Sequence, residues 1–175
     1  MNAPNPIAAR SPITTINPLE LRRSLSCFPT GVAVVTTIGQ LGGPVGVTIS
    51  SFNAVSLDPP LVLWSLALKA ASLADFRAAD YFAVNVLSEA QAELPRVFSS
   101  SAKERFDGVS WQGGHGGAPV LAGCAAVFEC SIYARHNGGD HEVIIGNVLR
   151  HSSSEASPLL YAKGRIGAVP DSLCQ

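Results

Sequence analysis

Short apolar runs separated by turns rich in glycine and proline fill most of this chain, and they constrain its fold more than any other feature. The runs are rich in Val, Ile, Leu and Thr, which is typical of strands. The clearest hairpin pairs two of them across Asn137-Gly138-Gly139-Asp140. About seven strands and few helices predict an antiparallel barrel. The expected strands cover residues 31–38, 46–49, 61–66, 81–87, 127–135, 141–149 and 159–168.

A helix is predicted to begin after Asn17, its N-cap, with Pro18 at the first helical position and Glu20 reaching back to the cap. Apolar residues then recur at helical spacing, which predicts a stripe that packs on the core: Leu21, Leu25 and Phe28. Capping-box patterns at 72–75 and 88–91 predict two more short helices, the second broken at Pro95. Residues 99–119 are predicted to form a long loop.

The length of 175 residues predicts one domain, with residues 1–16 as a mobile arm and residues 17–170 as the folded unit. Strands do not alternate regularly with long helices, and the glycine motifs of Rossmann and P-loop sites are absent from the sequence, which disfavours a doubly wound fold. Charged residues make up 14% and hydrophobic residues 47% of the chain, which favours a homo-oligomer that covers apolar surface.

Several classes of function are disfavoured by composition. The net charge is −1 and the basic residues are scattered, so no nucleic-acid footprint is expected. No apolar run is long enough to cross a membrane. Four cysteines without a C-x-x-C pair, and no signal peptide ahead of them, predict a cytoplasmic protein with reduced thiols. Cys124 and Cys130 lack the close companions of a metal site, so no metal is expected.

Three hydroxyl side chains gather where the predicted strand 46–49 ends: Thr48, Ser50 and Ser51. Asp58-Pro59-Pro60 then halts the run, because proline cannot donate to a ladder. Two interpretations are open. The hydroxyls could present donors and acceptors to a planar polar ligand, or they could lie in water on an edge strand.

Ordered motifs over residues 18–168 resemble one family. They are SCFPTGVAVVTT (26–37), VTISSFNAVSLDPPLVLWSL (47–66), YFAVNVLSEAQ (81–91), ERFDGVSW (104–111), GAPVLAGCAAVFEC (117–130), GGDHEVIIGNV (138–148) and PLLYAKGRIG (158–167). The chain is similar to the short-chain flavin reductases, the reductase components of two-component flavin-dependent monooxygenases. The resemblance implies a mainly β FMN-binding split barrel, a Greek-key antiparallel barrel with a few short helices. It also implies a homodimer with flavin near the subunit interface.

The resemblance also implies which residues bind flavin. The strand end from Gly46 to Phe52 is expected along the isoalloxazine ring, where donors aimed at N1 and O2 stabilise reduced flavin. Lys69 and the start of a helix at Ser72 suit the phosphate. Simpler roles are open for some of them: Lys69 solvated, Ser72 a helix cap, Phe106 a loop anchor. The implied flavin-binding residues are Thr30, Gly46, Val47, Thr48, Ser50, Ser51, Phe52, Ser65, Leu66, Lys69, Ser72 and Phe106.

His141 matches the histidine that the family places on the nicotinamide side of the flavin. It is expected to hold the carboxamide or pyrophosphate, because hydride transfer depends on positioning. Without the resemblance, it would be interpreted as a turn histidine paired with Asp140.

The implied activity is reduction of FMN or FAD by NADH or NADPH, with NADH favoured, and release of reduced flavin to a separate monooxygenase. Two alternatives are open. One is a non-catalytic flavin carrier or sensor on the same barrel, and the other is a β-barrel module for an unrelated small ligand.

Overall fold

The structure is a computed structural model that describes residues 16–100, 102, 104–170 and 172. All of the predicted arm except residue 16 lies outside these residues. The helices are α1 (Pro18–Leu25), α2 (Leu73–Ala78) and α3 (Leu94–Ser99), with 3-10 turns η1 (Glu89–Gln91) and η2 (His115–Gly117). The strands are β1 (Thr30–Gly31), β2 (Ala33–Ile38), β3 (Pro44–Ile49), β4 (Asn53–Leu57), β5 (Pro60–Ala67), β6 (Tyr81–Val86), β7 (Trp111–Gly113), β8 (Pro119–Leu121), β9 (Ala126–Asn137), β10 (His141–Ser153), β11 (Leu159–Ala162) and β12 (Arg165–Ala168).

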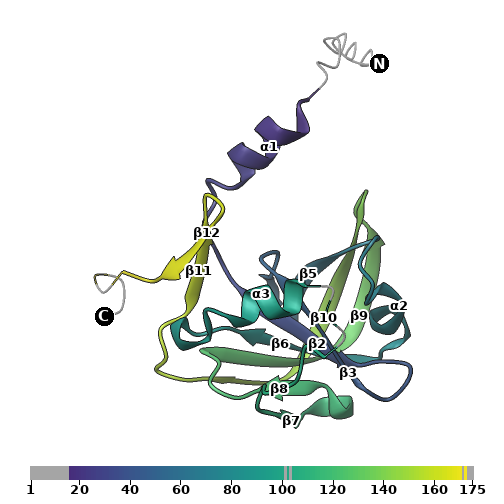
Figure 1. The fold of residues 1–175 in the computed structure, drawn as a ribbon. Coiled ribbons are helices and arrows are strands. Elements are labelled where there is room, and N and C mark those ends of the chain that lie inside the picture. The colour runs from purple at the N-terminus through teal and green to yellow at the C-terminus, as the bar shows by residue number, and fades with distance from the viewer. Residues whose placement is uncertain (1–15, 101, 103, 171, 173–175) are drawn as a thin grey trace, which may run out of the picture.

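The centre of the molecule is a seven-stranded antiparallel sheet in the order β3-β2-β6-β9-β10-β5-β4 (Figure 1). Its two edge strands, β3 and β4, are joined by only three residues, 50–52, yet they do not pair with each other. The predicted mainly β split barrel is therefore confirmed, but backbone hydrogen bonds do not close it. Two small sheets, β1-β11-β12 and β7-β8, complete the fold.

Apolar side chains are buried on both faces of the central sheet. One cluster surrounds Trp64, which is fully buried and lies edge-on to Phe76, with 5.1 Å between the ring centroids. The other cluster contains Val34, Leu87 and Phe98 and lies beneath α3 and β8. Because β2 contributes to both clusters, it is buried along nearly its whole length and does not alternate between buried and exposed residues.

Local chemistry explains the elements that the sequence predicted well. Asn17 Oδ1 accepts the N–H of Leu19 at 2.9 Å, so the predicted N-cap of α1 is confirmed. The β2–β3 hairpin turns through Gly42, whose φ of +80° favours glycine. The β9–β10 hairpin pairs Glu142 with Asn137, as the turn residues predicted.

The predicted core-facing stripe of α1 is wrong for this chain. Leu21, Leu25 and Phe28 are 44%, 65% and 74% exposed, and none of the residues of α1 is buried. Figure 1 shows why: α1 projects away from the sheet beside the β11–β12 hairpin. Helical spacing predicts an apolar face but not which surface covers it.

Prolines account for two further differences. The predicted break before the end of this segment is present, because η1 ends at Gln91 and a separate helix, α3, begins at Leu94. The difference is that Pro95 lies in the first turn of α3, where a proline gives up no intrahelical hydrogen bond. Asp58-Pro59-Pro60 does not stop strand structure: it is the tight turn between β4, which the sequence did not predict, and β5. Within the predicted loop 99–119, the segment 111–121 forms the β7–β8 pair.

The final predicted strand is a hairpin, because Lys163 and Gly164 both adopt positive φ between β11 and β12. None of the helices in the described part of the chain is long and apolar enough to span a membrane.

Candidate functional site

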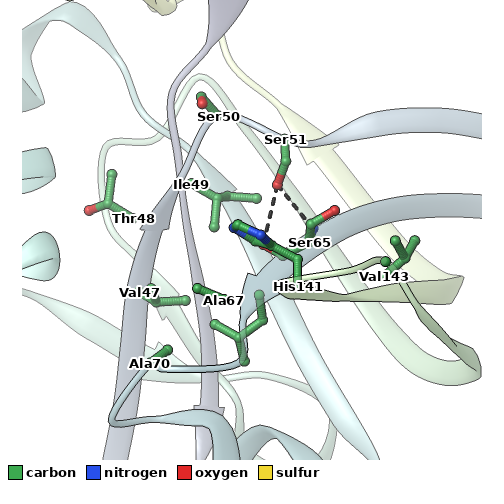
Figure 2. A pocket seen from close by; sticks show the side chains of 12 residues that line it. Val47, Thr48, Ile49, Ser50, Ser51, Ser65, Ala67, Ala70, His141 and Val143 are labelled. Atoms are coloured by element: carbon green, nitrogen blue, oxygen red, sulfur yellow. Dashed lines mark hydrogen bonds between the residues drawn. The ribbon is translucent and has the colours of Figure 1, made fainter. Parts of the chain in front are cut away.

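A pocket of about 520 Å³, here called the main pocket, lies between the ends of β3 and β5, beside the unpaired edge of β3 (Figure 2). The end of β3 and the linker after it form one wall, the end of β5 forms another, and the start of β10 adds His141. The lining residues are Val47, Thr48, Ile49, Ser50, Ser51, Ser65, Leu66, Ala67, Ala70, Gly138, His141 and Val143.

The hydroxyl of Ser51 fastens the linker to β5. Its Oγ accepts the N–H of Ser65 at 2.9 Å and lies 3.4 Å from the Ser65 carbonyl, as Figure 2 shows. The pairing of β4 with β5 ends at Asn53 and Leu63. Beyond that pair, the Ser51 hydroxyl accepts the Ser65 N–H in place of a backbone carbonyl. In this structure, the hydroxyl that the resemblance assigned to flavin shapes the pocket wall.

The other two hydroxyls of the cluster differ in their surroundings. Thr48 Oγ1 donates to the carbonyl of Pro95 at 2.9 Å, toward α3. Ser50 is exposed and lines the main pocket together with two neighbouring hollows of about 370 and 200 Å³. Of the three hydroxyls, Ser50 is the one without a hydrogen-bond partner in the described part of the chain. Its side chain is the freest to meet a ligand.

His141 reaches the pocket from the β9–β10 turn. Its Nδ1 lies 2.7 Å from Asp140 Oδ1, so an ionised Asp140 accepts the Nδ1 proton and leaves Nε2 for a ligand. The hydrogen bond from His141, with the positive charges of His141 and Lys69, lowers the pKa of Asp140. The imidazole remains 44% exposed. His141 therefore pairs with Asp140 and lines the pocket at the same time.

The structure gathers several of the predicted flavin-binding residues in the main pocket. Those that line it are Val47, Thr48, Ser50, Ser51, Ser65 and Leu66. Lys69 lies just beyond β5, close enough to Asp140 to affect its pKa. Leu66 is almost fully buried, so it supports the wall more than it meets solvent.

The remaining predicted residues lie outside the lining of this pocket. Phe52 is half-buried and packs against the core, with its ring centroid 5.3 Å from that of Phe128. Ser72 precedes α2 and is buried without a side-chain cap bond, although the sequence predicted one. Thr30 lines the smallest of the three hollows around Ser50, and its buried Oγ1 has no partner in the described part of the chain.

Gly46 and Phe106 meet each other on the opposite side of β3. A Cβ at Gly46 would lie 2.7 Å from Phe98 and 3.2 Å from Phe106. The Phe106 ring lies edge-on to Phe98 at 5.0 Å, and Arg105 donates to the Gly46 carbonyl at 3.0 Å. In this chain, the loop that carries Phe106 is anchored against β3, as the simpler interpretation of Phe106 expected.

Sequence reasoning did not single out Ile49, although it lies within the expected strand end 46–52, and it missed four other lining residues: Ala67, Ala70, Gly138 and Val143. The sequence could have indicated two of them. Ala67 follows Ser65 by two positions, so strand alternation places both on one face. Gly138 lies in the turn that positions His141. Ala70 and Val143 reach the pocket only through tertiary packing.

No group of three or more metal-ligating side chains occurs among the residues described. Burial raises the pKa of Cys124 to about 11 and that of Cys130 to about 12, so both thiols stay protonated. The chemistry available at the main pocket is therefore that of hydroxyls, backbone groups, an imidazole and a nearby ammonium.

Comparison with known proteins defines the class. The model of the flavin reductase like domain family matches residues 25–170, so the chain belongs to this family. FMN reductase (NADH) SmoA of Agrobacterium fabrum is 42% identical over 151 residues, which are 86% of each chain. Stachydrine N-demethylase reductase subunit Stc3 of Rhizobium meliloti is 41% identical over 85% of this chain. The match spans only 64% of Stc3.

Solved structures agree with the fold. NADH:FAD oxidoreductase SgcE6 of Streptomyces globisporus, in complex with NAD and FAD fragments, has a TM-score of 0.83 at 37% identity. The likeness covers 89% of this chain and 94% of SgcE6. Component B of nitrilotriacetate monooxygenase from Mycobacterium thermoresistibile has a TM-score of 0.84 at 35% identity, covering 89% and 88% of the two chains.

Proposed function

We propose that this protein is an NAD(P)H-dependent flavin reductase that supplies reduced FMN or FAD to a separate monooxygenase. The observation that carries the proposal is the main pocket itself. It brings the strand end with Thr48, Ser50 and Ser51 together with Ser65 and His141, in a chain of the flavin reductase like domain family.

The residues present fit a flavin. A flavin ring has an apolar edge and a polar pyrimidine edge, and the pocket offers both kinds of wall. Val47, Ile49 and Ala67 are apolar, whereas Ser50 and the unpaired edge of β3 present hydroxyl and backbone groups. Donors on this edge would stabilise the charge that collects on a reduced flavin.

The bound flavin would supply hydride-acceptor chemistry, taking two electrons and one proton from C4 of the nicotinamide at N5. The chain's part is placement. Asp140 holds the imidazole of His141 at the pocket rim, so His141 can hydrogen-bond the nicotinamide carboxamide. Lys69 offers a positive charge beside the same rim for a phosphate group. No protein base is needed for the transfer itself.

We infer that NADH is the preferred donor. SmoA is named an FMN reductase (NADH) and SgcE6 an NADH:FAD oxidoreductase, which supports NADH and leaves FMN and FAD both as acceptors. Reductase subunits of flavin-dependent monooxygenases among the relatives support a separate oxygenase that receives reduced flavin by diffusion. One of them, HsaB of Rhodococcus jostii, is 40% identical over 89% of this chain.

We further infer that residues 17–170 act as one domain and that the protein is a cytoplasmic homodimer. The family match over 25–170 supports the domain. The exposed apolar face of α1 supports a second copy as its cover, and the free thiols of Cys27, Cys124 and Cys130 agree with a reducing compartment.

The test is oxidation of NADH and NADPH by the purified protein with FMN, FAD or riboflavin. Turnover with a preferred flavin is expected, and His141→Ala should lower kcat/KM for NADH by roughly tenfold or more. His151→Ala, at the far end of β10, is the matched control and should leave kcat/KM unchanged. Flavin binding without turnover would indicate a carrier instead, and neither binding nor turnover would contradict the proposal.

A further inference from the structure

A second hollow shares His141 with the main pocket. It has a volume of about 330 Å³ and is lined by Arg77, Arg135, His136, His141 and Glu142, together with the β9–β10 turn. We call it the basic hollow. His141 lines both cavities, so its imidazole ring marks the boundary between them.

The basic hollow carries an excess of positive charge. Glu142 receives Arg77 Nε at 2.8 Å and Arg135 Nη1 at 3.3 Å, so one carboxylate faces two guanidinium groups. The Glu142 side chain is only 12% exposed, which strengthens these contacts over those of a solvated pair. Among the side chains that line the hollow, two guanidinium groups therefore face one carboxylate, and the Asp140 carboxylate at the rim has Lys69 nearby.

The two arginines are not equally free to bind a ligand. Arg135 Nη2 donates to the carbonyls of Phe76 and Ala79 at 2.7 and 3.2 Å, which fixes it at the end of α2. Arg77 contacts Glu142 with one side of its guanidinium and is 51% exposed. Arg77 is therefore the group that can meet a ligand in the hollow, held in place by Glu142 and Arg135 behind it.

The rim between the two cavities is short and ordered. The Leu68 N–H donates to the Asp140 carbonyl at 3.0 Å, which joins the end of β5 to the β9–β10 turn. Leu68 and Gly139 line the basic hollow, whereas Ala67 and Gly138, their chain neighbours, line the main pocket. A ligand that occupies the main pocket beside His141 can thus extend over this rim into the basic hollow.

We propose that the basic hollow binds a phosphate group of the reduced nicotinamide dinucleotide, with Arg77 as its principal contact. The inference rests on the proposed function, because it takes the nicotinamide ring to lie beside His141. A half-exposed guanidinium backed by a second arginine suits a phosphate, which accepts paired N–H donors. Either the pyrophosphate or a 2′-phosphate would provide this chemistry.

The experiment compares Arg77→Gln with the wild-type protein, using NADH and NADPH as donors and FMN as acceptor. A rise in KM of roughly five- to tenfold is expected, with the KM for FMN unchanged. An equal rise for both donors identifies the pyrophosphate, and a rise for NADPH alone identifies the 2′-phosphate. Arg165→Gln, which removes the same charge from exposed β12, is the control and should leave both KM values unchanged.

Glu142→Gln tests the same site, and its expected effect on the donor KM is opposite to that of Arg77→Gln. Removing the carboxylate leaves both guanidinium groups uncompensated, so the KM for the nicotinamide donor should fall, whereas a structural defect would raise it. Unchanged donor KM in Arg77→Gln, or a rise in the KM for FMN alone, overturns the inference while the proposed function stands. An inactive wild-type protein would instead contradict the proposed function itself.

Discussion

The hydroxyl of Ser51 bonds Ser65, whereas that of its neighbour Ser50 has no hydrogen-bond partner in the described part of the chain, so the two positions separate stability from ligand binding. Ser51→Ala would leave the Ser65 N–H without its acceptor at the split, so the free energy of unfolding should fall by about 1–2 kcal/mol. Ser50→Ala removes an exposed hydroxyl and should change stability by less than about 0.5 kcal/mol. Urea denaturation of both variants checks this, and equal losses would contradict it.

Gly46 on β3 leaves no room for a side chain. A methyl group at Gly46 would lie 2.7 Å from Phe98, so Gly46→Ala should destabilise the fold by about 1–3 kcal/mol and raise the KM for flavin. Gly31→Ala is the matched control, because a Cβ there meets nothing within 4 Å. Thermal unfolding with flavin kinetics measures both effects. Equal Tm values for the two variants would show that Phe98 and Phe106 yield.

Residue patterns predicted the hydroxyl cluster but not the direction of each side chain. Spacing places Thr48, Ser50 and Ser51 at one strand end. It does not show that the carbonyl of Pro95, forty-seven positions away, accepts from Thr48. The site of Phe106 was ambiguous for the same reason, because an aromatic residue in a loop suits a ligand and a core equally well.

At the scale of elements, the β7–η2–β8 segment is fastened to the outer face of the sheet by a buried carboxylate. Glu129 on β9 accepts from the His115 N–H at 2.8 Å and from Arg150, and lies 3.0 Å from His115 Nδ1. Burial acts to raise the pKa of Glu129, but the hydrogen bonds from Arg150 and His115 outweigh it, and the pKa is lowered.

This lowered pKa predicts how stability depends on pH. A carboxylate whose folded pKa lies below its unfolded value of about 4.3 stabilises the fold fully above that value, and the stabilisation is lost as pH falls through the folded pKa. Glu129→Gln should therefore be less stable than wild type near neutral pH, with the difference shrinking as pH falls below about 4.3. Urea midpoints across this range provide the measurement, and a constant difference would contradict the assignment.

The elements that the sequence predicted well are those fixed by local chemistry. The β2–β3 and β9–β10 hairpins follow from glycine turns between β-branched runs, and α1 follows from Asn17 and Pro18. β4 was missed because Asn53–Leu57 is exposed along an edge and shows no clear alternation. The start of α3 at Leu94 was missed because Pro95 is compatible with both a helix break and a first turn.

At the scale of the whole molecule, α1 and the β11–β12 hairpin project from the sheet and leave apolar side chains in solvent (Figure 1). Leu25 and Phe28 line a hollow of about 200 Å³ together with Thr30, Ser50 and Tyr161. Ser50 also lines the main pocket, so the exposed face of α1 is continuous with the candidate site. In the proposed homodimer, covering this face would also complete the surroundings of the pocket.

The homodimer predicts that a charge on α1 separates the subunits. Burying a leucine stabilises an interface by about 1.5–3 kcal/mol, so Leu25→Asp should raise the dimer dissociation constant at least about tenfold. Leu41→Asp places the same charge at the fully exposed tip of the β2–β3 hairpin and should leave the dimer intact. Sedimentation equilibrium measures both constants. Because α1 adjoins the pocket through Ser50, the Leu25→Asp protein should also bind flavin more weakly, whereas a dimer that survives this change would place the interface on another surface.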